Sequence, residues 1–235
     1  MKTQYFFVLF LFIINKSYSQ FNEIKNFQKQ IIENEITGSN TAMIYKDGKT
    51  LFYNIENSGK KGDKNISNQS YKPNLETIFP IWSMSKPITI VAMMILRERG
   101  MISINDNLSK YIPEFKNMTC KGEKGKYPCK KEIKIIHLLT HRSGFGYYSD
   151  QGYGYGYTNT LTYNNLEDFA KDLSKVELEF EPGEKYYYGL NQALLGRVVE
   201  IVSKKSFYDF LKDEIFDPLK MTETKFYLTE NDRSR

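Results

Sequence analysis

The sequence predicts an α+β fold, in which helices and antiparallel strands occupy separate stretches of one chain. Two β-prone runs joined by Asp-Gly at 47–48 give a strong hairpin signal. Residues 88–96 (ITIVAMMIL) are apolar on nearly every side, as in a buried helix, and 191–205 and 207–215 show helical spacing. With 235 residues, 40% of them apolar and 26% charged, the chain can form a sizeable core and is not typical of disordered or fibrous proteins.

Residues 1–19 are predicted to be a secretory signal peptide. Lys2 gives a positive start, 5–14 (YFFVLFLFII) is an unbroken apolar run, and the small residues Ser17 and Ser19 suit a cleavage site. A membrane anchor is the alternative, but this run is only about half of the roughly 20 residues that a transmembrane helix needs. We therefore expect a secreted or periplasmic protein with no stable membrane span after cleavage.

The first elements after the signal are a helix and a hairpin. Residues 21–36 carry apolar side chains close to the helical period, which predicts an amphipathic helix. The runs 41–45 and 50–55 are the two strands of the hairpin. The polar, punctuated stretch 57–74 is predicted to be a loop that leads to the buried helix at 88–96.

Short helical patterns alternate with turns in the second half. Residues 104–113 and 133–140 have this character, 166–173 is a further amphipathic helix, and Pro182-Gly183 marks a turn. Asp217-Pro218 ends the last predicted helix.

Cys120 and Cys129 are the two cysteines of the chain, and they bracket a polar segment (KGEKGKYP) that is typical of a surface insertion. In an exported protein we expect a disulfide that closes this loop. Such a short loop contributes about 2–3 kcal/mol in the chain-entropy model. A metal site is the alternative, but two thiols with no histidine nearby give poor zinc-ligand spacing, and we expect no metal.

Residues 81–87 (IWSMSKP) carry the clearest chemistry. Ser83 and Lys86 are three residues apart, so on a helix their side chains lie on one face within reach of each other. Pro87 places Ser83 at the helix N-terminus, because proline is tolerated only in the first turn. There the backbone N–H of Ser83 can bind an oxyanion, and in a Ser-x-x-Lys arrangement the lysine activates the serine without a histidine. Ser83 and Lys86 are thus candidate catalytic residues.

Several stretches in one order resemble the serine hydrolase family of class C β-lactamases, D-alanyl-D-alanine carboxypeptidases (penicillin-binding proteins) and related esterases. The first stretch runs from 77–79 through IWSMSKP into the apolar helix and on to 99–106 (RGMISIND). The others are 135–145 (IIHLLTHRSGF), 181–200 (EPGEKYYYGLNQALLGRVVE) and 210–226 (FLKDEIFDPLKMTETKF). The resemblance covers nearly the whole of 20–235. It implies a β-lactamase/transpeptidase-like fold, with an antiparallel sheet flanked by helices and an all-helical subdomain.

In that family the second motif supplies a tyrosine that shuttles a proton between nucleophile and leaving group. The spacing Tyr-Gly-x-Asn before Leu-Leu-Gly, seen in the esterase and acyltransferase branch, selects Tyr188, with Tyr187 as the runner-up. The lactamase branch has a substrate-contacting Asn two residues after this tyrosine. Here Leu190 holds that position and Asn191 follows, so Asn191 is a candidate substrate-binding residue and the balance moves toward esters.

The two histidines, His137 and His141, could face one metal ion from one side of a helix. No glutamate of a metalloprotease pattern lies between them, and His141 falls at the family's Thr-His-x-Ser-Gly position. We expect packing roles for both, and neither is placed for a histidine-based serine triad.

The family's third motif, a Lys-Thr-Gly or His/Gly-rich strand that also gives the second oxyanion-hole amide, lies well downstream of 210–226. The chain ends at Arg235 without it. The resemblance therefore implies that 20–235 is the N-terminal part of a larger, truncated hydrolase domain that lacks its C-terminal sheet strands and closing helix.

These observations predict an exported serine hydrolase that acts through an acyl-enzyme on ester or amide substrates, with β-lactams and D-alanyl peptides among the candidates. A D-alanyl-D-alanine carboxypeptidase or β-lactamase is one alternative, and a non-catalytic ligand- or wall-binding relative or inactive fragment is another. No cofactor is implied. The partners are small ester or amide molecules or peptidoglycan-type substrates. Nucleic acid is an unfavoured partner because the formal charge of +5 is mild and spread along the chain.

Overall fold

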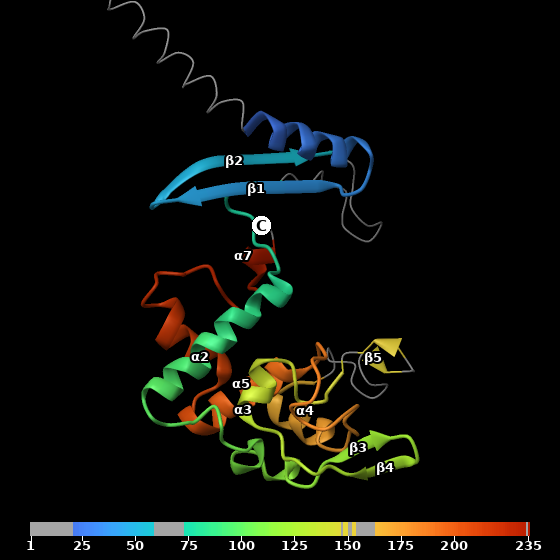
Figure 1. Cartoon of the computed structure of the whole chain (residues 1–235). Coiled ribbons are helices and arrows are strands. Elements are labelled where there is room, and N and C mark those ends of the chain that lie inside the picture. The colour runs from blue at the N-terminus through green and yellow to red at the C-terminus, as the bar shows by residue number, and fades with distance from the viewer. Residues whose placement is uncertain (1–20, 59–72, 147, 150–151, 154–162, 234) are drawn as a thin grey trace, which may run out of the picture. The chain divides into compact units, whose positions relative to one another are not determined.

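Figure 1 shows the computed structural model, which describes residues 21–58, 73–146, 148–149, 152–153, 163–233 and 235. The signal peptide predicted at 1–19 lies outside the described residues and stays a prediction. The chain divides into two compact units, one formed by residues up to Phe79 together with Glu230–Arg235, the other by Pro80–Thr229.

The first unit contains the predicted helix and hairpin. A helix over 21–33 precedes the antiparallel strands β1 (Ser39–Lys46) and β2 (Lys49–Asn57), and the short helix α7 (Glu230–Arg233) belongs to the same unit. The residues between the strands, Asp47 and Gly48, both have positive φ, at 51° and 74°, as a two-residue hairpin loop requires. The predicted hairpin is therefore confirmed.

A buried amide holds the helix of the first unit to its hairpin. Gln28 is almost fully buried, and its Nε2 donates to Oδ1 of Asn40 at 2.8 Å while its Oε1 accepts from Nδ2 of Asn54 at 3.1 Å. Phe21 stacks on Phe52 with ring centroids 5.2 Å apart. The polar groups of Gln28 are thus paired rather than left unsatisfied.

The second unit is built mainly from helices, coloured from green to red in Figure 1. These are η1 (Trp82–Ser85), α2 (Lys86–Glu98), η2 (Leu108–Lys110), η3 (Pro113–Phe115), α3 (Ile135–Leu139), α4 (Leu166–Leu173), α5 (Asn191–Ser203), α6 (Phe207–Leu211) and the π-helical turn η4 (Lys212–Phe216). The predicted helix at 166–173 is reproduced residue for residue, whereas the one at 207–215 changes from α to π geometry after Leu211.

Helices α2 and α5 pack together at the centre of this unit, with α3, α4 and α6 against α5. Ala92, Met93 and Leu96 of α2 have no accessible surface, and neither have Leu194, Leu195 and Val198 of α5. The apolar character of 88–96 reflects this burial, although Val91 is about half exposed. At about 25 cal/mol per Å² of apolar surface removed from water, such packing supplies most of the helices' stability.

The polar segment between the cysteines is a second hairpin rather than an irregular loop. Strands β3 (Thr119–Gly122) and β4 (Gly125–Pro128) pair antiparallel, and a disulfide joins Cys120 to Cys129 with Cα atoms 5.1 Å apart. Lys and Gly residues conceal the strand signal, because exposed edge strands tolerate charged side chains. Cys120 also bridges Leu178, which attaches the hairpin to the core.

A two-residue pair of strands, β5 (Tyr148–Ser149) and β6 (Gly152–Tyr153), completes the described strands. None of the helices in the described part of the chain reaches the length and apolarity that crossing a lipid bilayer requires.

Candidate active site

Ser83 lies in the single 3₁₀ turn of η1, and Lys86 is the first residue of α2. Pro87 occupies the first turn of α2, where its missing N–H leaves no unfilled hydrogen bond. Lys86 Nζ donates to Ser83 Oγ at 2.8 Å. The structure therefore brings the two side chains into contact, as their spacing predicts.

Trp82, immediately before Ser83, adopts a left-handed backbone conformation with φ of 45°. For a residue other than glycine this costs roughly 1–2 kcal/mol. Its side chain is 80% exposed and therefore gains little from packing. The strain is maintained by the following helix, whose Ala92, Met93 and Leu96 are fully buried.

Tyr188 completes a three-membered cluster with Ser83 and Lys86. Its Oη lies 2.8 Å from Ser83 Oγ, and Lys86 Nζ lies 4.8 Å from the centroid of its ring. Tyr187 makes other contacts: its backbone N–H donates to the carbonyl of His141, and its ring lies 6.4 Å from that of Phe180, centroid to centroid. Of the two tyrosines that the sequence left open, Tyr188 is the one beside Ser83.

The cluster changes the acidity of the tyrosine. Burial, the largest single effect, raises the pKa of Tyr188, but hydrogen bonds with Lys86 and Ser83 and the charge of Lys86 together outweigh it. The pKa of Tyr188 therefore lies below its ordinary value. A phenol in this position can give up its proton more readily than an isolated tyrosine.

The ring of His141 stacks against the ring of Tyr188. Their centroids lie 4.7 Å apart, with an interplanar angle of 20°. Nδ1 of His141 accepts from the backbone N–H of Gly189 at 3.2 Å and lies 2.8 Å from Nδ2 of Asn191. Because a backbone N–H can only donate, the neutral ring carries its proton on Nε2. Burial and then the charge of Lys86 lower the pKa of His141, which favours this neutral form.

Asn191 belongs to the same buried network. It has no accessible surface, and its Oδ1 accepts from the hydroxyl of Ser143, which is also fully buried. The Ser143 hydroxyl in turn accepts from the backbone N–H of Phe145 at 3.2 Å. In this structure Asn191 therefore positions His141 and Ser143, and a contact with substrate stays a prediction.

His137 is held apart from this network. Its Nδ1 accepts from the backbone N–H of Lys134 at 3.1 Å, and burial, followed by the charges of Lys134 and Arg142, lowers its pKa. Within the described residues, no group of three His, Cys, Asp or Glu side chains is arranged to hold a metal ion.

Sequence reasoning missed the histidine network. The signal available in the sequence was the Thr-His-x-Ser-Gly segment, which contains both His141 and Ser143. Its partner Asn191 lies 50 residues away from His141, so only the fold reveals the contact.

Comparison with known proteins gives this arrangement a family. The sequence matches the family described as Beta-lactamase over residues 26–235. Because the match covers most of the chain, the protein belongs to the beta-lactamase family, and the resemblance drawn from its motifs is confirmed.

Two curated relatives illustrate the similarity. Protein flp from Staphylococcus aureus (strain N315) is 30% identical over 220 residues, which are 93% of this chain and 40% of that protein. Esterase EstB from Burkholderia gladioli is 26% identical over 215 residues, which are 88% of this chain and 51% of EstB. The chain thus spans about half or less of the length of these relatives.

A solved structure supports the fold. That of EstCE1, a hydrolase with promiscuous acyltransferase activity, matches with a TM-score of 0.72 at 24% identity, over 94% of this chain and 56% of EstCE1. This similarity confirms the predicted α+β, β-lactamase/transpeptidase-like fold.

Proposed function

We propose that this protein is an exported serine hydrolase that cleaves esters through an acyl-enzyme. One observation carries the proposal: Ser83 Oγ lies 2.8 Å from Lys86 Nζ and 2.8 Å from Tyr188 Oη. A serine hydroxyl hydrogen-bonded to two groups that can exchange protons is the arrangement that an activated nucleophile needs. Ser83 is also exposed, so a substrate can reach it.

In the acylation step, Tyr188 is in its phenolate form beside the Lys86 ammonium group, and its Oη takes the proton of Ser83 as Ser83 Oγ forms a bond to the carbonyl carbon of the ester. The carbon–oxygen bond to the alcohol then breaks, and the Tyr188 hydroxyl gives this proton to the departing oxygen and becomes a phenolate again. Water hydrolyses the acyl-enzyme in the reverse sense, which releases the acid and restores the Ser83 hydroxyl. The lowered pKa of Tyr188 supports its part in this relay.

The negative charge that develops on the carbonyl oxygen needs a donor. The backbone N–H of Ser83 belongs to the first turn of η1, where amides have no partner within the helix. The start of α2 directly behind it adds the positive end of the helix dipole. We assign this amide as one oxyanion donor.

Esters are the preferred substrate class for two reasons. The spacing around Tyr188 is that of the esterase branch, and EstB and EstCE1 are named as an esterase and a hydrolase with acyltransferase activity. Amides, β-lactams and D-alanyl peptides remain alternatives that the experiment separates. The proposed reaction needs no cofactor. Export is inferred from the signal peptide predicted at 1–19.

The test uses the chain after removal of residues 1–19, together with Ser83→Ala. A fluorescent alkyl fluorophosphonate labels the wild type and not Ser83→Ala if Ser83 is the nucleophile. The matched control is Ser85→Ala, two residues along, whose hydroxyl donates to the carbonyl of Trp82 and contacts neither Lys86 nor Tyr188 in the described hydrogen bonds. It is expected to retain labelling.

Comparing hydrolysis of p-nitrophenyl acetate with that of nitrocefin then separates an esterase from a β-lactamase, and a fluorescent penicillin reports a penicillin-binding site. A folded protein that neither labels nor hydrolyses any of these substrates rejects the enzyme in favour of a non-catalytic relative.

A further inference from the structure

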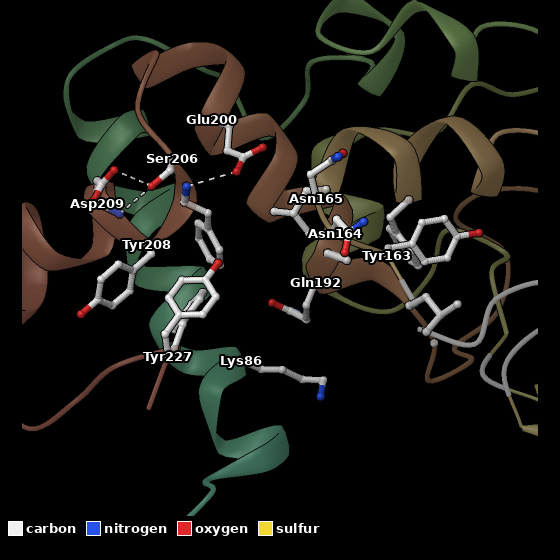
Figure 2. A pocket seen from close by; sticks show the side chains of 17 residues that line it. Lys86, Tyr163, Asn164, Asn165, Gln192, Glu200, Ser206, Tyr208, Asp209 and Tyr227 are labelled. Atoms are coloured by element: carbon white, nitrogen blue, oxygen red, sulfur yellow. Dashed lines mark hydrogen bonds between the residues drawn. The ribbon is translucent and has the colours of Figure 1, made fainter. Parts of the chain in front are cut away.

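A large pocket adjoins the Ser83–Lys86–Tyr188 cluster. Its volume is about 780 Å³, within the range of small-molecule sites, and it is lined by side chains of α4, α5 and α6, by Lys86 of α2 and by the segment at 226–227. Figure 2 shows Lys86 and Gln192 extending into it. Since Lys86 also donates to Ser83, the pocket and the proposed nucleophile share one side chain.

The walls of the pocket are largely apolar. Leu166 and Phe169 of α4 line it, with Ala193 of α5. The aromatic rings of Phe207 and Phe226 also line it and contact each other with centroids 5.8 Å apart. Apolar walls of this kind gain free energy by covering hydrocarbon, in proportion to the area removed from water.

The two acidic side chains at the pocket already accept hydrogen bonds from the protein. Glu200 accepts from Arg197 Nη1 at 3.1 Å and from the backbone N–H of Phe207 at 3.2 Å, and Asp209 accepts from the hydroxyl of Ser206 at 2.7 Å. Among the described lining residues Lys86 is the single cation, and it is engaged with Ser83. The pocket therefore favours a neutral occupant over a carboxylate.

Gln192 supplies a buried amide group that has no hydrogen-bond partner. Both its amide nitrogen and its amide oxygen are buried without a hydrogen-bond partner, and no other buried side-chain nitrogen or oxygen in the described residues shares this condition. Buried polar groups in proteins nearly always have a partner. Gln192 is thus placed to bond to a polar atom of a bound molecule.

We propose that this pocket binds the acyl group of the ester substrate, a neutral and mainly apolar chain that carries one hydroxyl or carbonyl group within reach of Gln192. The inference rests on the proposed function and specifies its substrate. The acyl chain is favoured over the alcohol because Lys86 lines the pocket, whereas Tyr188, the group beside the departing oxygen, does not.

The first experiment varies the chain length. Ser83 labelling by a fluorophosphonate establishes the nucleophile, and kcat/KM is then measured for p-nitrophenyl acetate, butyrate and octanoate. Because each buried methylene favours binding, we expect octanoate to exceed acetate by at least ~10-fold. Ala193→Phe fills the pocket and should remove most of this ratio. Ala42→Phe makes the same substitution at a half-buried position of β1 outside the pocket, and should keep it.

The second experiment tests the amide and uses a variant that preserves side-chain volume. Gln192→Leu should lower the preference for a hydroxyacyl ester over the plain acyl ester of equal length by ~10-fold, because the lost amide no longer bonds to the hydroxyl. Gln30→Leu, on an exposed face of the first helix, is the matched control and should leave the preference unchanged.

The outcomes separate the two proposals. If Ser83 does not label, the proposed function fails. If Ser83 labels but neither Ala193→Phe nor Gln192→Leu changes the acyl preference, the acyl pocket is wrong. A matched series of acetate esters of longer alcohols tests whether the pocket binds the alcohol. If Ala193→Phe changes the preference among these alcohols and not among acyl chains, the assignment of the pocket to the acyl group is overturned.

Discussion

Gly189, the residue after Tyr188, is the position where one added methyl group should disturb the site most. A Cβ built on Gly189 lies 2.2 Å from the carbonyl oxygen of Phe145. Relief of that contact to about 3.5 Å requires a displacement of roughly 1.3 Å, and backbone rather than a flexible side chain must move. Since Gly189 also donates to His141, the shift carries Tyr188 and its stacked histidine with it.

A displacement of about 1 Å at a reacting group costs on the order of 100-fold in rate. We therefore expect Gly189→Ala to reduce the rate of Ser83 labelling and kcat/KM for a p-nitrophenyl ester by ~100-fold, with a loss of about 1–3 kcal/mol in the free energy of unfolding. Urea unfolding gives the change in the free energy of unfolding, and a quenched time course of labelling gives the rate, both on the same preparation.

The control is Gly125→Ala, at the first residue of β4. Its φ of 106° strains any alanine, but a Cβ there meets nothing within 4 Å, so the added methyl group displaces no neighbour. Gly125→Ala should lower the free energy of unfolding by a comparable amount and leave the rate of Ser83 labelling unchanged. If Gly189→Ala folds and labels at the wild-type rate, or if Gly125→Ala loses as much activity, the reasoning about Tyr188 is refuted.

Three further predictions follow. Lys86→Met removes the hydrogen bond and charge that oppose burial, so the pKa of Tyr188 should rise; the alkaline tyrosinate absorbance, taken as the difference from Tyr188→Phe, shows whether it does. Asp106 has its pKa lowered from 3.8 to about 2, first by the hydrogen bond from Tyr111, so its charged form stabilises the fold above about pH 4 and that contribution is lost as pH falls toward 2. Asp106→Asn should therefore cost on the order of 1–2 kcal/mol at pH 7, a difference that fades in urea titrations near pH 2 and whose persistence there contradicts the assignment. Cys120→Ser opens a disulfide that closes a loop of sequence separation 9 and should lower the free energy of unfolding by about 2–3 kcal/mol, as measured against the oxidised wild type.

Periodicity in the sequence predicted the helices best where burial is one-sided and local. The helix at 166–173 alternates buried and exposed residues at helical spacing, and its N-cap Asn165 accepts from the backbone N–H of Asp168 at 2.8 Å. Residues 212–216 kept the helical pattern of apolar positions, yet their backbone adopts π geometry. Hydrophobic spacing does not distinguish these geometries, because both bury the same face.

The sequence spacing also predicted the contact between Ser83 and Lys86, because residues three apart lie on the same face of a helical turn. It could not decide between Tyr187 and Tyr188 without the family resemblance, because neighbouring side chains in an extended segment point to opposite sides. The choice depends on tertiary contacts. The backbone N–H of Tyr187 donates a hydrogen bond to the carbonyl of His141, and this fixes the segment so that the side chain of Tyr188 reaches Ser83.

His141 shows why a histidine near the proposed serine nucleophile need not act as its base. Its Nδ1 is occupied by two donors, Gly189 and Asn191, and its pKa is lowered by burial and by the charge of Lys86. The ring is therefore held neutral with its face against Tyr188. A charged imidazole in that position would raise the positive potential beside Lys86 and change the acidity of the tyrosine. With His141 neutral, Lys86 is the cation that lowers the pKa of Tyr188 against the effect of burial, so the proton relay that we propose depends on one lysine rather than on a histidine triad.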